Sequence, residues 1–118
     1  MSQSIIKDKS YSFALRIIRL YKFLTEEKHE FVLSKQVLLA GMSIGEHVKE
    51  ALQSESRAEF AHQQNVALKQ ASKTEYWLQL LKDAEFIEPP AFDSINADCV
   101  ELIKLLTSIV KTSRQNQK

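Results

Sequence analysis

Apolar residues recur along most of this chain with the three- and four-residue spacing of an amphipathic helix. Phe13, Ile17, Leu20 and Leu24 show the spacing plainly, since they fall on one stripe of a helix. A stripe of this kind predicts a helix that buries one side against its neighbours. Similar stripes in later segments predict helices over residues 8–27, 31–53, 57–86 and 94–113.

The second predicted helix is the most apolar part of the chain. Between Val37 and Ile44 its only polar side chain is Ser43, so the helix has almost no solvent face and needs partners on more than one side. It also holds both glycines, Gly41 and Gly45, four residues apart on one side. We expect them to let another helix approach closely, namely the third, whose middle is lined with alanine.

Surplus apolar surface on the second helix predicts a contact between copies of the chain as well as a bundle core. The residues expected at this contact, or in close helix packing, are Leu38, Leu39, Gly41, Met42 and Gly45.

The third predicted helix has a long stripe at heptad spacing that includes polar residues. The stripe consists of Phe60, Gln64, Ala67, Ala71, Thr74, Leu78 and Leu81. The spacing continues over about four turns, and the alanines in its middle predict that a neighbouring helix comes close.

Local signals predict where the helices begin and end. Proline disfavours helix in the residue before it, so the pair at 89 and 90 is expected to stop the third helix. Residues 115–118 are expected to fray. The candidate N-caps are Asp8 or Ser10 for the first helix, Ser56 in a capping box with Glu59 for the third, and Asp93 or Ser94 for the fourth.

Four amphipathic helices with short connections predict an all-α fold, an antiparallel up-down-up-down four-helix bundle. The 118 residues make one domain, 1–118, which is large enough to bury a core without metals or disulfides. Two glycines and two prolines are too few for a turn-rich β-sandwich. The single cysteine, Cys99, lies in the apolar pattern of the fourth helix and is expected to be buried, which suits a reducing compartment.

Composition and charge constrain the function only weakly. Sixteen Lys and Arg residues against fifteen Asp and Glu residues give a formal net charge of +1, so no overall field points to nucleic acid or to an acidic partner. No apolar run approaches the ~20 residues of a membrane span, and charges interrupt any signal peptide. We therefore expect a cytoplasmic protein with no membrane partner.

Basic residues gather near both ends of the chain. Helix faces in water commonly carry such residues, and the helix dipole favours cations in the last turns of a helix, so neither group requires a ligand. A ring of copies would nevertheless multiply whichever of them share a face. The candidates for nucleic-acid contacts are Arg16, Arg19, Lys22, Lys104, Lys111 and Arg114.

Two patterns resemble motifs of enzymes but lack the required context. Residues 41–45 match Gly-x-Ser-x-Gly, but a nucleophile elbow needs a strand-to-helix turn, whereas this segment continues a helical pattern on both sides. Residues 26–29 and 59–62 match Glu-x-x-His, but a di-iron bundle needs such pairs in mid-helix together with glutamates from the other helices. We expect no enzyme activity, no cofactor and no bound metal.

Several segments follow one another in a characteristic order. They are Ser43-Ile44, His47-Val48, Glu50, Ser56 with Glu59-Phe60, Ala67-Leu68-Lys69-Gln70-Ala71-Ser72-Lys73-Thr74-Glu75-Tyr76-Trp77-Leu78, and Phe86-Ile87. In this order they resemble a bacterial four-helix-bundle family whose members include proteins encoded in intervening sequences of large-subunit ribosomal RNA genes. The similarity covers nearly the whole chain, and the segment in the third helix is its most specific part.

The resemblance implies an antiparallel four-helix bundle that assembles into a ring-like homopentamer. A related accessory protein of diversity-generating retroelements is a pentameric barrel whose basic surface binds nucleic acid and a reverse transcriptase. This chain departs from the family where Leu38 and Leu39 replace two frequent arginines, where His47 replaces asparagine and where Ala51 replaces glycine. The missing arginines weaken the expectation of nucleic-acid binding.

Together these features predict a non-enzymatic, self-associating helical bundle that serves as a binding or scaffold protein. The expected partner is the chain itself. The alternative is an accessory protein that binds RNA or DNA through the basic faces of a homo-oligomeric ring.

Overall fold

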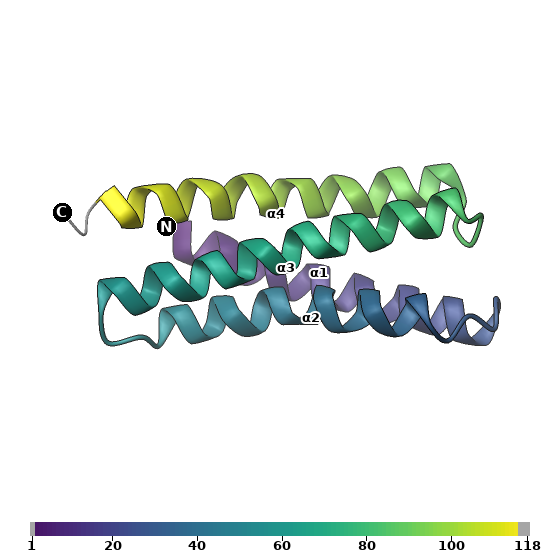
Figure 1. The fold of residues 1–118 in the computed structure, drawn as a ribbon, viewed down its shortest axis with the longest axis horizontal. Helices are drawn as coiled ribbons and strands as arrows, with labels where there is room; N and C mark the ends of the chain where they lie inside the picture. Colours follow the sequence, from purple (N-terminus) through teal and green to yellow (C-terminus); the bar gives the residue numbers. More distant parts are fainter. Residues whose placement is uncertain (1, 116–118) are drawn as a thin grey trace.

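The computed structural model describes residues 2–115, with only the backbone for residues 2–4. Within that range the chain forms the helices α1 (Ser2–Glu26), α2 (Leu33–Leu52), α3 (Arg57–Asp83) and α4 (Pro89–Gln115), and no strand. The helices run alternately up and down in an elongated bundle that measures 49 × 21 × 20 Å (Figure 1). The predicted all-α four-helix bundle is confirmed.

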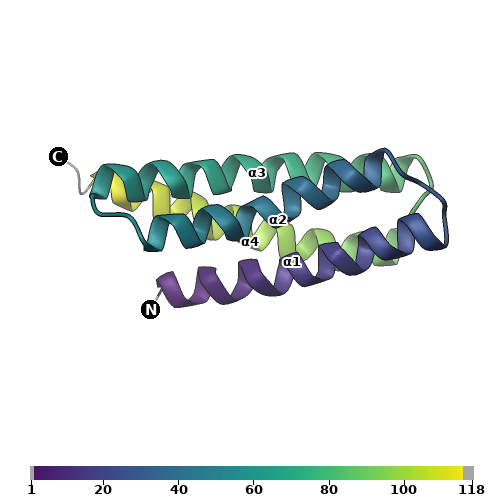
Figure 2. The same ribbon diagram turned by 90° about the horizontal axis from the view of Figure 1, so that it is seen from below.

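Each helix packs against the next one along the chain, and α4 returns to α1. Within residues 2–115 the backbones of the diagonal pairs, α1 with α3 and α2 with α4, stay more than 8 Å apart from Cα to Cα. Of the adjacent pairs, α1 and α4 have the least extensive contact, and no connection joins them. Figure 2 shows the connection from α1 to α2 at one end of the bundle and that from α2 to α3 at the other. The largest fully buried side chains include Phe13, Ile17, Ile44, Leu78 and Leu106, which come from all four helices.

The first helix begins earlier than its sequence signals suggest. It starts at Ser2, so the prediction that Asp8 or Ser10 would cap it at about residue 8 is wrong. Ile6 is fully buried, and this tertiary contact stabilises the additional turns. Ser10 lies inside the helix, 1% exposed, and its hydroxyl donates to the Lys7 carbonyl at 3.1 Å.

The fourth helix also begins earlier than predicted. It starts at Pro89, so neither Asp93 nor Ser94 is its cap. Proline is tolerated in the first turn because the N–H groups there have no partner within the helix. The Phe92 N–H donates to the Glu88 carbonyl at 3.0 Å, which closes the first turn. The prolines therefore open α4, while α3 ends at Asp83 rather than 86. The expected fraying of 116–118 lies outside the described residues.

The connections before α2 and α3 are held by side-chain caps. The Glu30 carboxylate accepts the backbone N–H groups of Leu33 at 3.0 Å and Ser34 at 2.7 Å, and thereby caps α2. The predicted Ser56 cap of α3 is confirmed, since its hydroxyl accepts the Glu59 N–H at 3.0 Å. These caps place α2 and α3 within two residues of the predicted starts.

Both glycines of α2 face α1, so the prediction that they face the alanine-lined middle of α3 is wrong. A Cβ atom added to Gly41 would lie 2.7 Å from Ile17 Cγ1, and one added to Gly45 would lie 3.6 Å from the Ser10 carbonyl oxygen. Ala71 of the α3 stripe lies beside α4, where the Cys99 thiol donates to its carbonyl at 3.3 Å.

Candidate interaction surfaces

The apolar residues predicted on α2 separate into exposed and packed positions. Leu39 is 48% exposed and Met42 is 37% exposed, whereas Leu38 is half-buried against the core. Gly41 is buried and Gly45 half-buried at the α1 contact described above. Of these five predicted residues, Leu39 and Met42 present large apolar side chains to the solvent.

Helix α1 adds two exposed apolar residues beside them. Tyr11 is 68% exposed and Leu15 is 38% exposed. The close approach of Ile17 to Gly41 fixes how the two antiparallel helices align along their axes. This alignment places Leu15 within one helical turn of Met42 along the bundle. We call Tyr11, Leu15, Leu39 and Met42 the outer α1–α2 surface. Tyr11 and Leu15 are absent from the residues predicted above. They lie outside the core stripe but are four residues apart, which is the spacing of a second apolar stripe on the same helix.

A groove between α2 and α3 continues from Leu39. It has a volume of about 560 Å³ and is lined by Leu39, Ala40, Tyr76 and Trp77 together with polar residues. Tyr76 is 58% exposed, and its ring meets the Trp77 ring edge-on, with 5.2 Å between the centroids. The apolar exposure of the bundle thus extends from α1 across α2 to α3.

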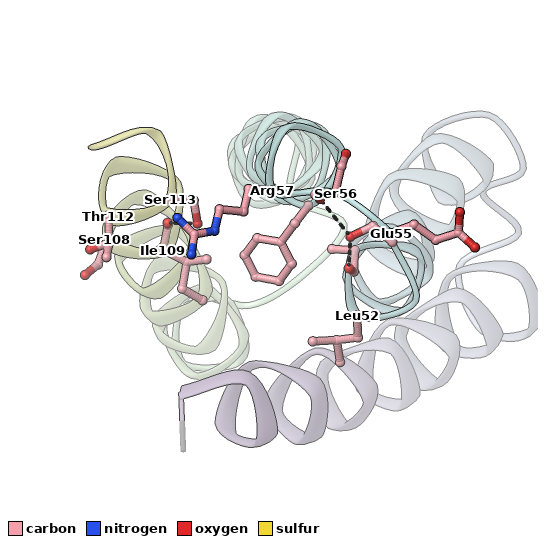
Figure 3. Close-up of a pocket in the computed structure, with 11 residues that line it drawn as sticks. Leu52, Glu55, Ser56, Arg57, Ser108, Ile109, Thr112 and Ser113 are labelled. Atoms are coloured by element: carbon pink, nitrogen blue, oxygen red, sulfur yellow. Dashed lines mark hydrogen bonds between the residues drawn. The ribbon is translucent and has the colours of Figure 1, made fainter. Parts of the chain in front are cut away.

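A larger pocket of about 670 Å³ lies at one end of the bundle, between the α2–α3 connection and the last turns of α4. Figure 3 shows Arg57 extending toward α4 beside Ser113, while Ser108 and Thr112 point away from the pocket. The hydroxyls of Ser56 and Ser113 are engaged by backbone groups, as partners of the Glu59 N–H and the Ile109 carbonyl. Its lining provides no nucleophile paired with a base.

The candidate nucleic-acid residues on α1 differ in their availability. Arg16 is held against α4, where its Nη1 lies 2.7 Å from Asp98 Oδ2 and its Nη2 donates to the Ser94 hydroxyl at 3.0 Å. Arg19 and Lys22 are exposed, and neither forms an ion pair within residues 5–115. Two of the three candidate residues on α1 are therefore not engaged in an ion pair among the described residues.

The basic residues of α4 do not join those of α1 on one copy. Lys111 and Arg114 line a groove of about 420 Å³ on the α3 side of α4. Lys104 is exposed in the middle of the same helix. Arg16 instead meets Asp98 on the α1 side of α4, thirteen residues from Lys111, which is roughly 20 Å along a helix. The six candidates thus form two separate groups.

A further groove, of about 370 Å³, lies where α1 and α4 pack least closely. We call it the α1–α4 groove. Ile87 and Ile95, each 6% exposed, lie beneath it, while Phe23 is 41% exposed at its edge. Its lining consists of Arg16, Arg19, Leu20, Phe23, Ile87, Glu88, Ala91 and Ile95.

The residues that resembled enzyme motifs are engaged in the fold. The Ser43 hydroxyl donates to the Leu39 carbonyl at 2.6 Å within an unbroken helix, so it forms no nucleophile elbow. Among the described residues no group of three His, Cys, Asp or Glu side chains could hold a metal ion. Burial raises the pKa of the Cys99 thiol to about 12, with a further contribution from the charge of Glu75, so the thiol is a poor nucleophile.

The sequence matches the family model of the 23S rRNA-intervening sequence protein over residues 2–108, which span α1 to α3 and most of α4. The chain belongs to this family. Its resemblance to proteins encoded in ribosomal RNA intervening sequences is therefore confirmed.

A solved structure from Bacteroides thetaiotaomicron is similar to this family member over nearly its whole length. The two sequences are 52% identical, the match covers 94% of this chain and 99% of that one, and the TM-score is 0.93. That protein is described as one of unknown function from the S23 ribosomal protein family. No curated protein matches the sequence.

The family match includes the outer α1–α2 surface and the α1–α4 groove but excludes Lys111 and Arg114. The His47 Nδ1 lies 2.8 Å from Gln63 Oε1 and so links α2 to α3. Within the described residues, none of the helices of this family member is long and apolar enough to cross a membrane.

Proposed function

We propose that this member of the 23S rRNA-intervening sequence protein family is a non-enzymatic binding or scaffold protein that works as a homo-oligomer. Copies contact one another through the outer α1–α2 surface. One observation carries the proposal: Tyr11, Leu15, Leu39 and Met42 are each at least 37% exposed on two adjacent helices. Large apolar side chains exposed together on neighbouring helices are typical of a surface that contacts another protein.

Burying this surface between two copies would contribute favourable free energy to their association. Full burial of a large apolar side chain contributes about 1.5–3 kcal/mol, so covering half-exposed ones contributes about 1 kcal/mol each. The family resemblance implies an arginine where Leu39 stands, so a charge that would keep this surface in water is missing. The family resemblance supports a ring of five copies.

The mass of the protein in solution tests the proposal. We expect light scattering to give several times the 13.6 kDa of one chain. The double variant Leu39→Glu, Met42→Glu should shift the mass to that of the monomer while its helical circular dichroism stays unchanged. Ala97→Glu, at an exposed position of α4, is the matched control and should assemble normally. A monomeric wild type at every concentration would overturn the proposal.

Nucleic-acid binding by the oligomer is the second candidate function. Its support is that Arg19 and Lys22 are exposed without an ion-pair partner among the described residues. Fluorescence anisotropy with labelled single-stranded RNA should then show an affinity that falls steeply with salt, because phosphate contacts release counterions. Reversing the charges of Arg19 and Lys22 should weaken binding. Equal binding by this variant and the wild type would contradict this function.

A further inference from the structure

The groove between α2 and α3, which we call the α2–α3 groove, has an exposed aromatic ring in its lining. Tyr76 is 58% exposed, and Trp77 beside it packs against the core. Their edge-on contact, with 5.2 Å between the centroids, holds the Tyr76 ring and uses at most one of its two faces. A flat ligand can therefore stack on this ring.

Three polar side chains line the same groove and have no partner in the fold. The amides of Gln36 and Gln70 and the ammonium of Lys73 form no hydrogen bond or ion pair among the described residues. An amide offers a donor and an acceptor together, and an ammonium offers a positive charge. The groove is thus suited to a ligand that has a hydrogen-bonding edge and a negative group.

The charge at the groove is positive. Lys73 alone is charged among the described residues that line it. Glu75, two residues further along α3, lies on the α4 side, where its charge acts on the buried thiol. Glu46 on α2 is next to His47, whose Nδ1 contacts Gln63. Gln63 is ten residues before Lys73, roughly 15 Å along α3, so Glu46 is too far away to neutralise this lysine.

A nucleotide has the chemistry that these side chains would recognise. Its base stacks on an aromatic ring, the edge of adenine pairs through N6 and N7 with a glutamine amide, and its phosphate attracts a lysine. The volume of the groove, about 560 Å³, lies within the usual range for a small-molecule site. A proline-rich peptide also binds aromatic grooves, but it carries no negative group for Lys73.

We propose that the α2–α3 groove binds a nucleotide, with the base stacked on Tyr76, the edge of the base on Gln36 and the phosphate on Lys73. Because α2 and α3 are antiparallel and His47 meets Gln63, Gln36 lies level with the turn of α3 that carries Lys73 and Tyr76. This site goes beyond the functions proposed above, since it requires neither the cations of α1 nor a contact between copies.

The fluorescence of Trp77, the only tryptophan of the chain, reports on the groove. We expect AMP to change it in a saturable way, whereas ribose 5-phosphate and inorganic phosphate, which lack the base, should not. Tyr76→Ala should weaken AMP binding about 5- to 150-fold, the effect of losing one stacked base, and Tyr76→Phe should retain it. The matched control is Phe31→Ala, at an aromatic residue that is 62% exposed and outside the groove.

Two further variants test the other contacts. Lys73→Gln should weaken the binding of AMP but not that of adenosine, which has no phosphate. Lys49→Gln, at an exposed lysine of α2 outside the groove, is its control. Gln36→Leu should reduce the preference for AMP over UMP, because the amide pairs with the adenine edge.

Comparing AMP with a short RNA of adenines identifies the source of the nucleotide. Much tighter binding of the RNA, lost in Tyr76→Ala, assigns the groove to an unpaired base of a strand, whereas equal binding assigns it to a free nucleotide. The proposal is wrong if neither ligand changes the fluorescence of Trp77, or if Tyr76→Ala binds AMP as well as Phe31→Ala does. Binding of a proline-rich peptide in place of AMP would also overturn it.

The functions proposed above can fail separately. Reversing the charges of Arg19 and Lys22 should leave AMP binding unchanged, because neither residue lines the α2–α3 groove. A wild type that is monomeric should bind AMP equally well. Loss of AMP binding in the Arg19 and Lys22 variant would show that the nucleotide lies on α1 and not in this groove.

Discussion

Gly41 and Gly45 lie four residues apart on α2, yet α1 approaches them to different degrees. A Cβ atom at residue 41 would lie 2.7 Å from Ile17 Cγ1 and 2.8 Å from Ile17 Cγ2, whereas one at residue 45 would meet nothing closer than 3.6 Å. The first distance requires the helices to shift, and the second is an ordinary van der Waals contact. The two positions should therefore respond in opposite directions to the same substitution.

We expect Gly41→Ala to lower the free energy of unfolding by about 1–3 kcal/mol, as overpacking does. Gly45→Ala should raise it by about 0.5–1 kcal/mol, because alanine loses less backbone entropy in a helix. Urea unfolding at one fixed protein concentration compares the two, since assembly shifts apparent stability. Equal changes in both variants would show that α1 does not pack on α2 in this register.

Gln64 is a fully buried amide in an otherwise mostly apolar stripe. Its side chain is 0% exposed, and neither Nε2 nor Oε1 has a hydrogen-bond partner among the described residues. Burying an amide without partners costs about 1–3 kcal/mol in mutational data. We expect Gln64→Met, which keeps the length of the side chain, to raise the free energy of unfolding by a similar amount.

The exposed position 79 on the same helix supplies the control. Gln79→Met should leave the urea midpoint nearly unchanged, because its amide stays in water in both states. A loss of stability in Gln64→Met would show that this amide is hydrogen-bonded in solution.

At the scale of a single element, α2 depends on a carboxylate outside the helix. Burial raises the pKa of Glu30, but the hydrogen bonds from the N–H groups of Leu33, Ser34 and Val32 outweigh it, and the net pKa is lowered from 4.5. A lowered folded pKa means that the cap is fully stabilising above the unfolded value. The contribution is lost as the pH falls through the folded value.

We expect Glu30→Ala to cost about 0.5–2 kcal/mol near pH 7, the range found when a side-chain cap of a helix N-terminus is lost. The difference from the wild type should shrink below pH 4.5, where the wild-type carboxylate also becomes protonated. Thermal unfolding between pH 3 and pH 7 measures this. Glu27→Ala, at an exposed residue of the same connection, should show a much smaller difference. A difference between Glu30→Ala and wild type that is independent of pH would rule out the carboxylate as the cap.

At the scale of the whole molecule, the contact between α1 and α4 is the weakest in the bundle. Two ion pairs cross it, Lys9 with Glu101 at 3.1 Å and Arg16 with Asp98 at 2.7 Å, and their side chains are between 35% and 50% exposed. Exposed ion pairs contribute less than about 1 kcal/mol each. The two ion pairs therefore add little to the α1–α4 contact, along which the α1–α4 groove lies.

We expect Asp98→Asn to lower the free energy of unfolding by less than about 1 kcal/mol, and high salt to reduce the difference further. Chemical denaturation of both proteins at two salt concentrations provides the measurement. A loss of several kcal/mol would show that the Arg16 ion pair holds the bundle closed.

The sequence by itself determined the number of helices, their amphipathic character and most of the α3 core stripe, including the buried Gln64 and Thr74. These features are local, since periodicity and capping act within a few residues. It also indicated the surplus apolar surface on α2, of which Leu39 and Met42 are exposed.

Only the tertiary structure decided which neighbour each stripe meets. A stripe of small residues permits close approach but does not identify the helix that approaches, so Gly41 and Gly45 face α1 and not α3. The early start of α1 depends on burial of Ile6, which no local signal shows. Pro89 favours the first turn of a helix, but the pair at 89 and 90 also predicts the end of α3, so the local signal alone did not place the start of α4. The grooves and the separation of the basic residues have the same origin, because they depend on the order and register of helices around the bundle.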